Sequence, residues 1–528
     1  MKKTIFLLAI LFNFTFISAQ IMEMDILKFV QPDINGTARY TSMAGAFGAL
    51  GGDASAIKDN PAGLGVYRRS DFTATLNILT QSAKATWAGY DGKNHQYNAK
   101  FDNLSYVIAY PTWSQKTGLN TGLLYSNFSF SFNRLKNFDR NLIINGGEFE
   151  VSMSDYMAHL ANNASNSNMS YENDRVAWLS VLGYDAYLIN EVLNSENKKE
   201  WQPELRDGER TIPTYNLKER GSVDEYSFAW SGNISNRLYL GMSLNLQTID
   251  YLVYSTYNEN FVGANDYYFT LRNEFSMSGY GCNVKMGAIY QPADFVRLGL
   301  SFQTPTRFLM SDTYNPSIDY SLYSLALDKN GKEIGMVDGK DIRPEDNDGR
   351  LMTGFSDYKM KNPMQWNASA AYFFGKKGLL STEYVYNALG NAMLYDTDNS
   401  TDGFERQNNN MNNVLQSMHT IKIGAEYRAT DNVSLRAGLA TTTTATKQDA
   451  VKEMFSNTLR TDSEFFRHTG TNYITAGIGY RERYWYFDFA YMHKQLNESF
   501  MPYDTNALEA AEVTTSNNNF VATFGFRF

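Results

Sequence analysis

Apolar and polar side chains alternate along most of the second half of this chain. In the C-terminal stretch Phe520–Phe528, every second residue is Phe or Ala, and the residues between them are Val, Thr, Gly and Arg. The same period recurs in Leu238–Gln247, Val433–Ala440 and Trp485–Met492. A period of two places the two sets on opposite faces of a β-strand. Each tract has close to the about 9–11 residues that a tilted strand needs to cross a membrane.

Fourteen such tracts occur along the chain, and the gaps between them alternate between short turns, such as Ser235–Arg237, and long loops, such as Leu135–Asp224. The tracts are Phe72–Thr80, Leu104–Thr112, Asn120–Asn133, Glu225–Ile234, Leu238–Tyr251, Ser278–Tyr290, Val296–Phe308, Gln365–Phe374, Leu379–Asn387, Thr420–Arg428, Val433–Thr441, Tyr473–Tyr480, Trp485–His493 and Phe520–Phe528. Outer-membrane barrels combine an even strand number with short periplasmic turns and long external loops, whereas a soluble sandwich has no reason to do so. The pattern predicts an all-β, 14-stranded antiparallel transmembrane β-barrel over residues 71–528.

The beginning of the chain has the layout of a secretory signal peptide. Lys2 and Lys3 precede an apolar run from Ile5 to Ile17, which is too short to span a bilayer, and Ser18-Ala19 follows it. We expect residues 1–19 to be removed after Ala19. The rest of the chain contains no uninterrupted apolar run long enough for a transmembrane helix, so it would enter a membrane as strands.

A stretch rich in Gly and Ala, Gly36–Arg69, lies directly before the first predicted strand. Small side chains allow close packing of the backbone, and glycine allows turns that other residues resist. Pro61 biases Asn60 away from the helical conformation, which predicts a bend there. The stretch has too little apolar bulk to form a domain alone. We therefore predict that residues 20–70 form an N-terminal extension and a hatch that fits inside the barrel.

Composition agrees with a barrel without requiring one. Aromatic residues make up 15% of the chain, with 36 Tyr and 34 Phe, beside 38 Gly. This suits an apolar outer surface, a polar interior and aromatic girdles, although a secreted carbohydrate-binding β-protein shares the composition. The single cysteine, Cys282, excludes an intrachain disulfide. The net charge of −9 argues against a nucleic-acid partner, because phosphate binding needs clustered Lys and Arg.

Several stretches resemble one known family of membrane proteins. Gly48–Ala62, which ends in Asn60-Pro61-Ala62, looks like that family's N-terminal hatch, and Asn362–Trp366 looks like the Pro and Trp that lead into a mid-barrel strand. Asn472–Gln495 is similar to the penultimate hairpin, and Phe528 is the terminal aromatic typical of outer-membrane barrels. The family is the FadL/TodX outer-membrane transporters of hydrophobic compounds, and its Bacteroidetes-type members, sometimes labelled hemin receptors, look closest.

The resemblance implies passive uptake of a hydrophobic small molecule across the outer membrane of a Gram-negative bacterium. A ligand such as a long-chain fatty acid would bind the loops first and then a pocket above the hatch. A shift of the hatch motif, Asn60, Pro61, Ala62 and Gly63, would release it, with lateral release into the bilayer. We expect a monomer whose partners are the ligand, outer-membrane lipid and, through Phe528, the barrel-assembly machinery. The ligand itself, whether fatty acid, aromatic hydrocarbon or heme, is not specified by the sequence.

Charged side chains on the inward face of the predicted strands are candidates for ligand binding in the lumen. An arginine there can bind a ligand carboxylate through two parallel hydrogen bonds. Alternatively, these side chains pair with one another and with the plug, which we expect for most of them. The candidates are Arg297, Lys422, Arg436, Lys285 and Glu383.

The long loop between the third and fourth tracts contains a helix-like piece, Arg175–Leu193, with apolar residues at roughly helical spacing. Trp178, Leu179 and Leu182 either line an apolar groove that captures the ligand or pack the loops together. The resemblance favours the groove.

Motifs for catalysis and metal binding are missing from the sequence. Asp398–Gly403 resembles half of a calcium loop, but Asn409 stands where the bidentate Glu is required. The five histidines are scattered without HExxH, and GxSxG, Walker A and GxGxxG are absent. We therefore expect no catalytic residue, no metal, no cofactor and no enzyme activity. Two alternatives stay open: a structural or adhesive barrel with a permanently closed plug, and a barrel lipase or protease.

Overall fold

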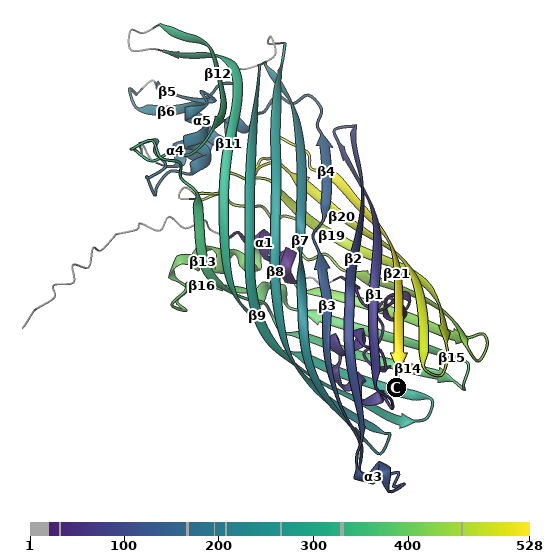
Figure 1. Ribbon diagram of the computed structural model, residues 1–528. Coiled ribbons are helices and arrows are strands. Elements are labelled where there is room, and N and C mark those ends of the chain that lie inside the picture. Colours follow the sequence, from purple (N-terminus) through teal and green to yellow (C-terminus); the bar gives the residue numbers. More distant parts are fainter. Residues whose placement is uncertain are drawn as a thin grey trace, which may run out of the picture.

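The strands form one closed antiparallel β-barrel around the N-terminal segment (Figure 1). The computed structural model describes residues 21–30, 33–164, 168–194, 196–205, 208–263, 267–327, 332–455 and 458–528. The barrel closes where β1 (Asp71–Trp87) pairs with β21 (Ala511–Arg527), from Asp71 opposite Arg527 to Thr86 opposite Glu512. The expected signal peptide, residues 1–19, lies outside the described residues.

The wall consists of eighteen strand segments, which form fourteen strands. Four of the strands are made of two consecutive segments each: β3 with β4, β10 with β11, β13 with β14, and β15 with β16. Between β1 and β21 these segments are β2 (Tyr90–Pro111), β3 (Leu123–Asn137), β4 (Arg140–Asn145), β7 (Arg210–Ile234), β8 (Leu238–Val262), β9 (Tyr268–Ala293), β10 (Val296–Gln303), β11 (Arg307–Leu327), β13 (Gly354–Lys361), β14 (Gln365–Phe374), β15 (Gly378–Asn387), β16 (Met393–Tyr395), β17 (Met418–Arg428), β18 (Val433–Thr442), β19 (Phe465–Arg481) and β20 (Trp485–Met501). The predicted fourteen-stranded antiparallel barrel is confirmed.

Three further strands and ten short helices complete the described part of the chain. The strands are β12 (Glu333–Ile342), which pairs antiparallel with the end of β11, and the hairpin of β5 (Ile189–Leu193) with β6 (Lys199–Pro203). The helices are α1 (Glu23–Val30), α2 (Ala38–Ser42), η1 (Ser55–Lys58), η2 (Pro61–Val66), α3 (Trp113–Lys116), α4 (Met153–Asn163), α5 (Trp178–Asp185), η3 (Leu389–Asn391), η4 (Asp402–Phe404) and α6 (Glu405–Val414). Among the described residues, no helix is long and apolar enough to cross a membrane.

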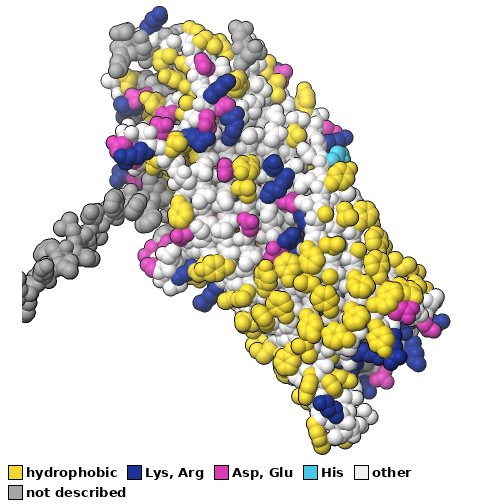
Figure 2. All heavy atoms as spheres, in the orientation of Figure 1, with side chains coloured by type: hydrophobic (Ala, Val, Ile, Leu, Met, Phe, Trp, Pro, Cys, Tyr) yellow, Lys and Arg dark blue, Asp and Glu magenta, His cyan; other side chains and the backbone are white. Residues whose placement is uncertain are grey.

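Alternation along the strands places apolar side chains on the outside of the wall. Phe524 and Phe526 are 50% and 45% exposed, whereas Thr523, next to Phe524, is buried. On β8, Leu240 and Leu244 are exposed, and Asn245 is buried. Figure 2 shows hydrophobic side chains gathered over the part of the barrel nearer the C-terminus, with charged side chains above and below. This is the surface expected of a wall that faces lipid.

Several strands continue well beyond the lengths that alternation predicts. β7, β8 and β9 have 25, 25 and 26 residues, more than twice the about 9–11 needed to cross a bilayer. The additional part of β7 includes Lys218, Glu219 and Arg220, which interrupt the apolar alternation of a lipid-facing strand. The wall therefore rises past the hydrophobic surface on the side opposite the short turns (Figure 1).

The predicted helix over Arg175–Leu193 is wrong in its second half. Helix α5 ends at Asp185, and β5 begins at Ile189. Tyr187 adopts a left-handed conformation with φ 58°, which cannot continue a right-handed helix. Apolar spacing located the helix but gave no sign of this turn.

The hatch packs on a set of wall glycines. A Cβ added at these positions would overlap hatch atoms, so only glycine lets the two backbones approach this closely. At Gly299, for example, the added Cβ would lie 2.5 Å from the carbonyl oxygen of Gly48. The glycines are Gly241, Gly287, Gly299, Gly424, Gly438 and Gly477.

Substitution of one of these glycines is expected to loosen the hatch. In Gly287→Val, the new side chain would overlap Asn60 Oδ1, and overpacking of this kind costs about 1–3 kcal/mol. We expect faster hydrogen exchange of hatch peptides with little change in the wall. Gly378→Val is the control for a lost glycine, because a Cβ built there lies 3.6 Å or more from its neighbours, none of which belongs to the hatch. Equal exchange of the hatch in both variants would contradict tight docking on Gly287.

Candidate functional site

The Asn-Pro-Ala motif lies inside the barrel, where it begins helix η2. Asn60 is extended, with φ −141° and ψ 103°, which confirms the predicted bend before Pro61. Asn60 Oδ1 accepts a hydrogen bond from the Ala62 N–H at 3.1 Å, and its Nδ2 donates to Gly48 O at 2.7 Å. Asn60, Pro61, Ala62 and Gly63 are all buried. The motif therefore shapes the hatch and joins its two halves.

A buried carboxylate on β15 anchors the hatch to the wall. Glu383 is 2% exposed, and its Oε2 accepts hydrogen bonds from the Phe47 and Gly48 N–H groups at 3.1 and 2.7 Å. Its Oε1 accepts from Lys422 Nζ at 2.8 Å, and the same Nζ lies 3.8 Å from Asp59 Oδ2 of the hatch. Glu383 and Lys422 thus contact two separate stretches of the hatch at once.

The other three lumen candidates also pair with the protein itself. Lys285 contacts Glu225 at 2.8 Å, and Arg436 Nε contacts Glu426 at 2.6 Å. Arg297 donates from NH1 to Leu50 O of the hatch at 2.9 Å. The inward direction that alternation predicts is correct for all five candidates. Their contacts give them structural roles, and none of the five lines the cavity above the hatch.

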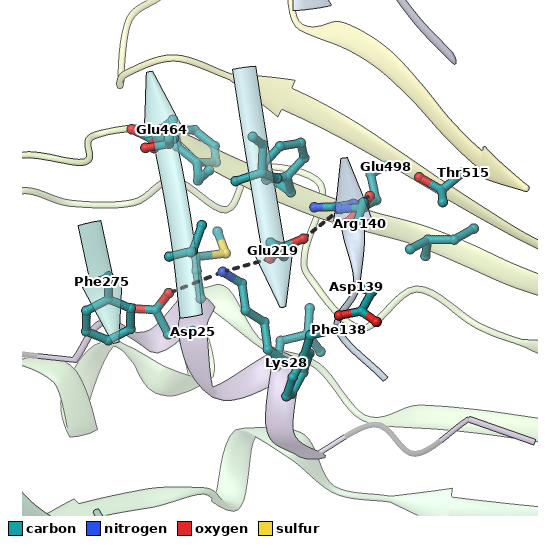
Figure 3. Close-up of a pocket in the computed structure, with 18 of the residues that line it drawn as sticks. Asp25, Lys28, Phe138, Asp139, Arg140, Glu219, Phe275, Glu464, Glu498 and Thr515 are labelled. Atoms are coloured by element: carbon teal, nitrogen blue, oxygen red, sulfur yellow. Dashed lines mark hydrogen bonds and ion pairs between the residues drawn. The ribbon is translucent and has the colours of Figure 1, made fainter. Parts of the chain in front are cut away.

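A cavity lies in the lumen between the hatch and the long loops, with α1 as part of its lining (Figure 3). Its volume of ≈ 160 Å³ is about ten times what one water needs. Aromatic side chains contribute an apolar wall: Phe138, Tyr215, Phe275, Tyr314, Phe465 and Phe466. Charged side chains from α1 and the strands face the same space, so the cavity combines apolar surface with ionic groups.

Lys28 of α1 links the helix to the wall of this cavity. Its Nζ lies 3.6 Å from Glu219 Oε1 of β7 and 3.8 Å from Asp25 Oδ1 (Figure 3). The same Nζ donates to the Tyr251 hydroxyl at 2.8 Å. Glu219 in turn accepts from Arg140 Nε at 2.7 Å, and Arg140 also pairs with Glu498 of β20. Charges from three wall segments therefore meet beside α1.

A second ionic group attaches α1 to the loop before β19. Arg460 is 1% exposed; it lies 3.2 Å from Asp25 Oδ2 and also pairs with Asp462. Its guanidinium lies 4.1 Å from the centre of the Phe275 ring, a cation–π contact. Burial alone would raise the pKa of Asp25, but Arg460, Lys28 and Lys452 hold it below its usual value. Asp25 is therefore ionised and paired at neutral pH.

Glu23, on the other hand, makes the attachment of α1 depend on pH. Burial, with repulsion from Asp25 and Glu453, raises its pKa to about 7 from 4.5. Between pH 4.5 and about 7, Glu23 is therefore protonated more often in the docked helix α1 than in a helix released into solvent. Protonation favours docking, so docking weakens as the pH rises through this range. Asp25, whose pKa is below 3.8, stays ionised throughout this range.

We therefore expect a spin label at Leu27→Cys, in a Cys282→Ser background, to be more mobile at pH 8 than at pH 5. Glu23→Gln cannot ionise and should keep the label equally immobile at both values. If the label in Glu23→Gln responds to pH as strongly as in the parent, another group controls α1.

The wall has a seam, defined here as the boundary between β2 and the β3–β4 segment above Asn103. The β2–β3 pairing ends where Asn103 opposes Asn133, and β4 then pairs with β7 alone. A Cβ at the inward-facing Gly92 of β2 would overlap Ile143 O, so β4 crosses the inner side of β2. Lys100 of β2 bridges the seam to Asp139 at 2.9 Å, and Asp139 also lines the cavity.

The expected capture residues are not available to solvent. Trp178 is 1% exposed, and Leu179 and Leu182 are fully buried. They pack in the same hydrophobic cluster as Met157 of α4, and the Ser180 hydroxyl donates to Met157 O at 3.0 Å. These three residues therefore do not line an open apolar groove. They pack the loops together, as in the alternative interpretation.

Sequence reasoning missed most of the cavity. Asp25 and Lys28 lie in the extension before the hatch motif, and Arg460 lies in a long loop without periodicity. Acidic residues in the first turn of Glu23–Val30 and Lys28 in its last turn are a helix signal that could have located α1. Nothing local in the sequence pairs Asp25 with a residue 435 positions away.

No protein-family model and no curated protein matches the chain. Among solved structures, the chain is similar to a FadL homologue of Pseudomonas aeruginosa, with a TM-score of 0.52 and 12% identity over 94% of this chain and 99% of that one. It is similar to the deltaS2 mutant of TodX, a monoaromatic hydrocarbon channel, with a TM-score of 0.50 and 12% identity over 94% and 100%. These similarities show that the chain has the fold of these barrels.

Proposed function

We propose that this protein is an outer-membrane channel of the FadL/TodX type that takes up hydrophobic small molecules by diffusion. One observation carries the proposal: a hatch fills the lumen of a lipid-facing barrel, and a cavity of mixed apolar and ionic character lies directly above it. A solute that enters from the long-loop side would reach this cavity before the hatch. The solved structures of the same fold are described as a FadL homologue and a monoaromatic hydrocarbon channel.

The lining of the cavity favours an amphiphile with an acidic head, such as a long-chain fatty acid. Rings such as Phe275 and Phe466 offer apolar surface to a hydrocarbon chain. Lys28 and Arg140 are the candidate partners of the ligand carboxylate. Both now pair with Glu219, and each would exchange this carboxylate for that of the ligand.

Two routes lead out of the cavity. A shift of the hatch around Asn60 would open the lumen towards the periplasm. The lower end of the seam, beside the exposed ring of Phe101 on β2, would open the wall sideways into the bilayer. The seam supports lateral release because Asp139 lies at both the cavity and the seam, and only side chains such as Lys100 bridge the strands there. Lateral release also keeps the transported hydrophobic molecule out of water.

Uptake of a labelled long-chain fatty acid into liposomes tests the proposal. The intact protein should give saturable uptake, and deletion of Gly36–Gly63 should give a barrel that also leaks small polar solutes. Equal behaviour of the two proteins, or no uptake by either, would favour the alternative of a structural or adhesive barrel with a permanently closed plug. A lipid-hydrolysis assay on the same liposomes should show no activity, as expected of a channel rather than an enzyme.

A further inference from the structure

A basin lined by six arginines lies at the short-turn end of the barrel, on the far side of the hatch from the lumen cavity. Its volume is ≈ 380 Å³. Figure 2 shows Lys and Arg side chains, with Asp and Glu side chains among them, near the end of the barrel that carries the C-terminus. The arginines are Arg39, Arg68, Arg69, Arg297, Arg481 and Arg527. We call this space the arginine basin.

The six guanidinium groups come equally from the hatch and from the wall. Arg39 lies on α2, and Arg68 and Arg69 join η2 to β1. The wall supplies the other three, one each from β10, β19 and β21. Whatever binds between these groups therefore touches both parts of the molecule.

Positive charge in the arginine basin exceeds the negative charge that balances it. Arg39 pairs with Glu426 at 3.0 Å, and Arg527 pairs with Asp71 at 3.2 Å. For the other four arginines, no carboxylate oxygen of the described residues lies within 4.0 Å. These like charges line one space, so an anion between them would be bound favourably.

The existing contacts of these four arginines leave donors free. Arg297 donates to Leu50 O and Gln291, and Arg69 donates to Arg483 O at 3.1 Å. Within the described residues, the Arg481 guanidinium contacts the Tyr486 ring, whose centre lies 5.2 Å from the guanidinium carbon. Arg68 is more fully used, because its NH1 donates to Gly65 O at 2.9 Å and its NH2 donates to Asn236 Oδ1 at 2.7 Å. Each guanidinium carries five N–H donors, so Arg69, Arg297 and Arg481 keep most of their donors for a ligand.

We propose that the arginine basin binds a phosphate group and that the bound phosphate ties the hatch to the wall. Guanidinium forks match phosphate oxygens in pairs, and a tetrahedral phosphate offers more acceptors to arginines arriving from several directions than a flat carboxylate does. The volume admits the ion with water around it, since one water needs only about 10–15 Å³. The phosphate comes from a lipid headgroup of the periplasmic leaflet or from free phosphate in the periplasm.

The first test is calorimetric titration of inorganic phosphate into the delipidated full chain at constant ionic strength. One phosphate should bind per chain, and Arg69→Gln/Arg481→Gln should weaken binding at least tenfold. The control, Arg237→Gln/Arg428→Gln, removes the same charge from exposed arginines that do not line the basin. No binding, an equal loss in the control, or tighter binding of octanoate than of phosphate would each overturn the proposal.

The second test separates the two sources and examines the hatch. Protein extracted from vesicles of phosphatidylcholine with phosphatidylglycerol is weighed by native mass spectrometry. Retained phosphatidylglycerol that inorganic phosphate displaces identifies a lipid headgroup; phosphate binding without retained lipid identifies the free ion. Phosphate should also slow hydrogen exchange of the peptide Gly51–Arg69, and unchanged exchange would overturn the tie between hatch and wall. None of these measurements depends on transport, so they stand apart from the uptake assay.

Discussion

Replacing Glu383 with alanine is expected to release the hatch. The change removes the acceptor of the Phe47 and Gly48 N–H groups and leaves Lys422 buried, with only Asp59 at 3.8 Å. Removing one partner of a buried ion pair costs about 3–5 kcal/mol. Since each 1.4 kcal/mol is about tenfold, the undocked fraction should rise more than a hundredfold. Hydrogen exchange of residues 36–66 and ion conductance in planar bilayers should both increase.

Glu225→Ala is the matched control for this prediction. Glu225 is fully buried, pairs with Lys285 at 2.8 Å and accepts hydrogen bonds from Gln247 and Ser227, all of which belong to the wall. It should destabilise the barrel by a similar amount without releasing the hatch. If both variants conduct equally, general loosening of the lumen explains the effect. If Glu383→Ala stays closed, the remaining contacts, such as those of the wall glycines and of Arg297 with Leu50 O, hold the hatch without Glu383.

The wall is the part of this molecule that sequence predicts best, because its physical constraint is local. Lipid outside and packed polar groups inside impose a period of two on each strand, so Phe524 and Thr523 reveal their faces without knowledge of any other strand. Asn60-Pro61 is local in the same sense, since the ring of Pro61 restricts the residue before it.

Contacts across the lumen could not be predicted, because they join residues that are far apart in the sequence. Alternation gives the direction of Lys422 and Glu383 but not their depth, and depth decides whether a side chain meets the hatch or the cavity. Trp178, Leu179 and Leu182 show the same limit in the loops: apolar spacing marks the buried face of α5, but only the tertiary structure shows that α4 covers it. The ion pair between Asp25 of α1 and Arg460 likewise joins residues from opposite ends of the chain.

Replacing Arg460 with methionine is expected to free α1 while leaving the hatch in place. Methionine can fill the space beside Phe275 and Tyr314, but it leaves Asp25 with Lys28 at 3.8 Å and Asp462 with Lys452 at 2.9 Å. The loss of a buried partner again costs about 3–5 kcal/mol. Hydrogen exchange of residues 21–30 should accelerate strongly, while residues 38–66, held by Glu383, should be unchanged.

The double variant Arg460→Met/Asp25→Asn decides whether charge or packing holds α1. If uncompensated charge on Asp25 is the cause, neutralising it should restore part of the protection, with a coupling of about 0.5–3 kcal/mol between the two sites. If packing against the rings is the cause, Asp25→Asn should restore nothing. Release of the hatch together with α1 would show that the two are one unit, which contradicts the separate anchors at Arg460 and Glu383. Separate release means that the lumen cavity can change shape at α1 while the barrel stays closed below it.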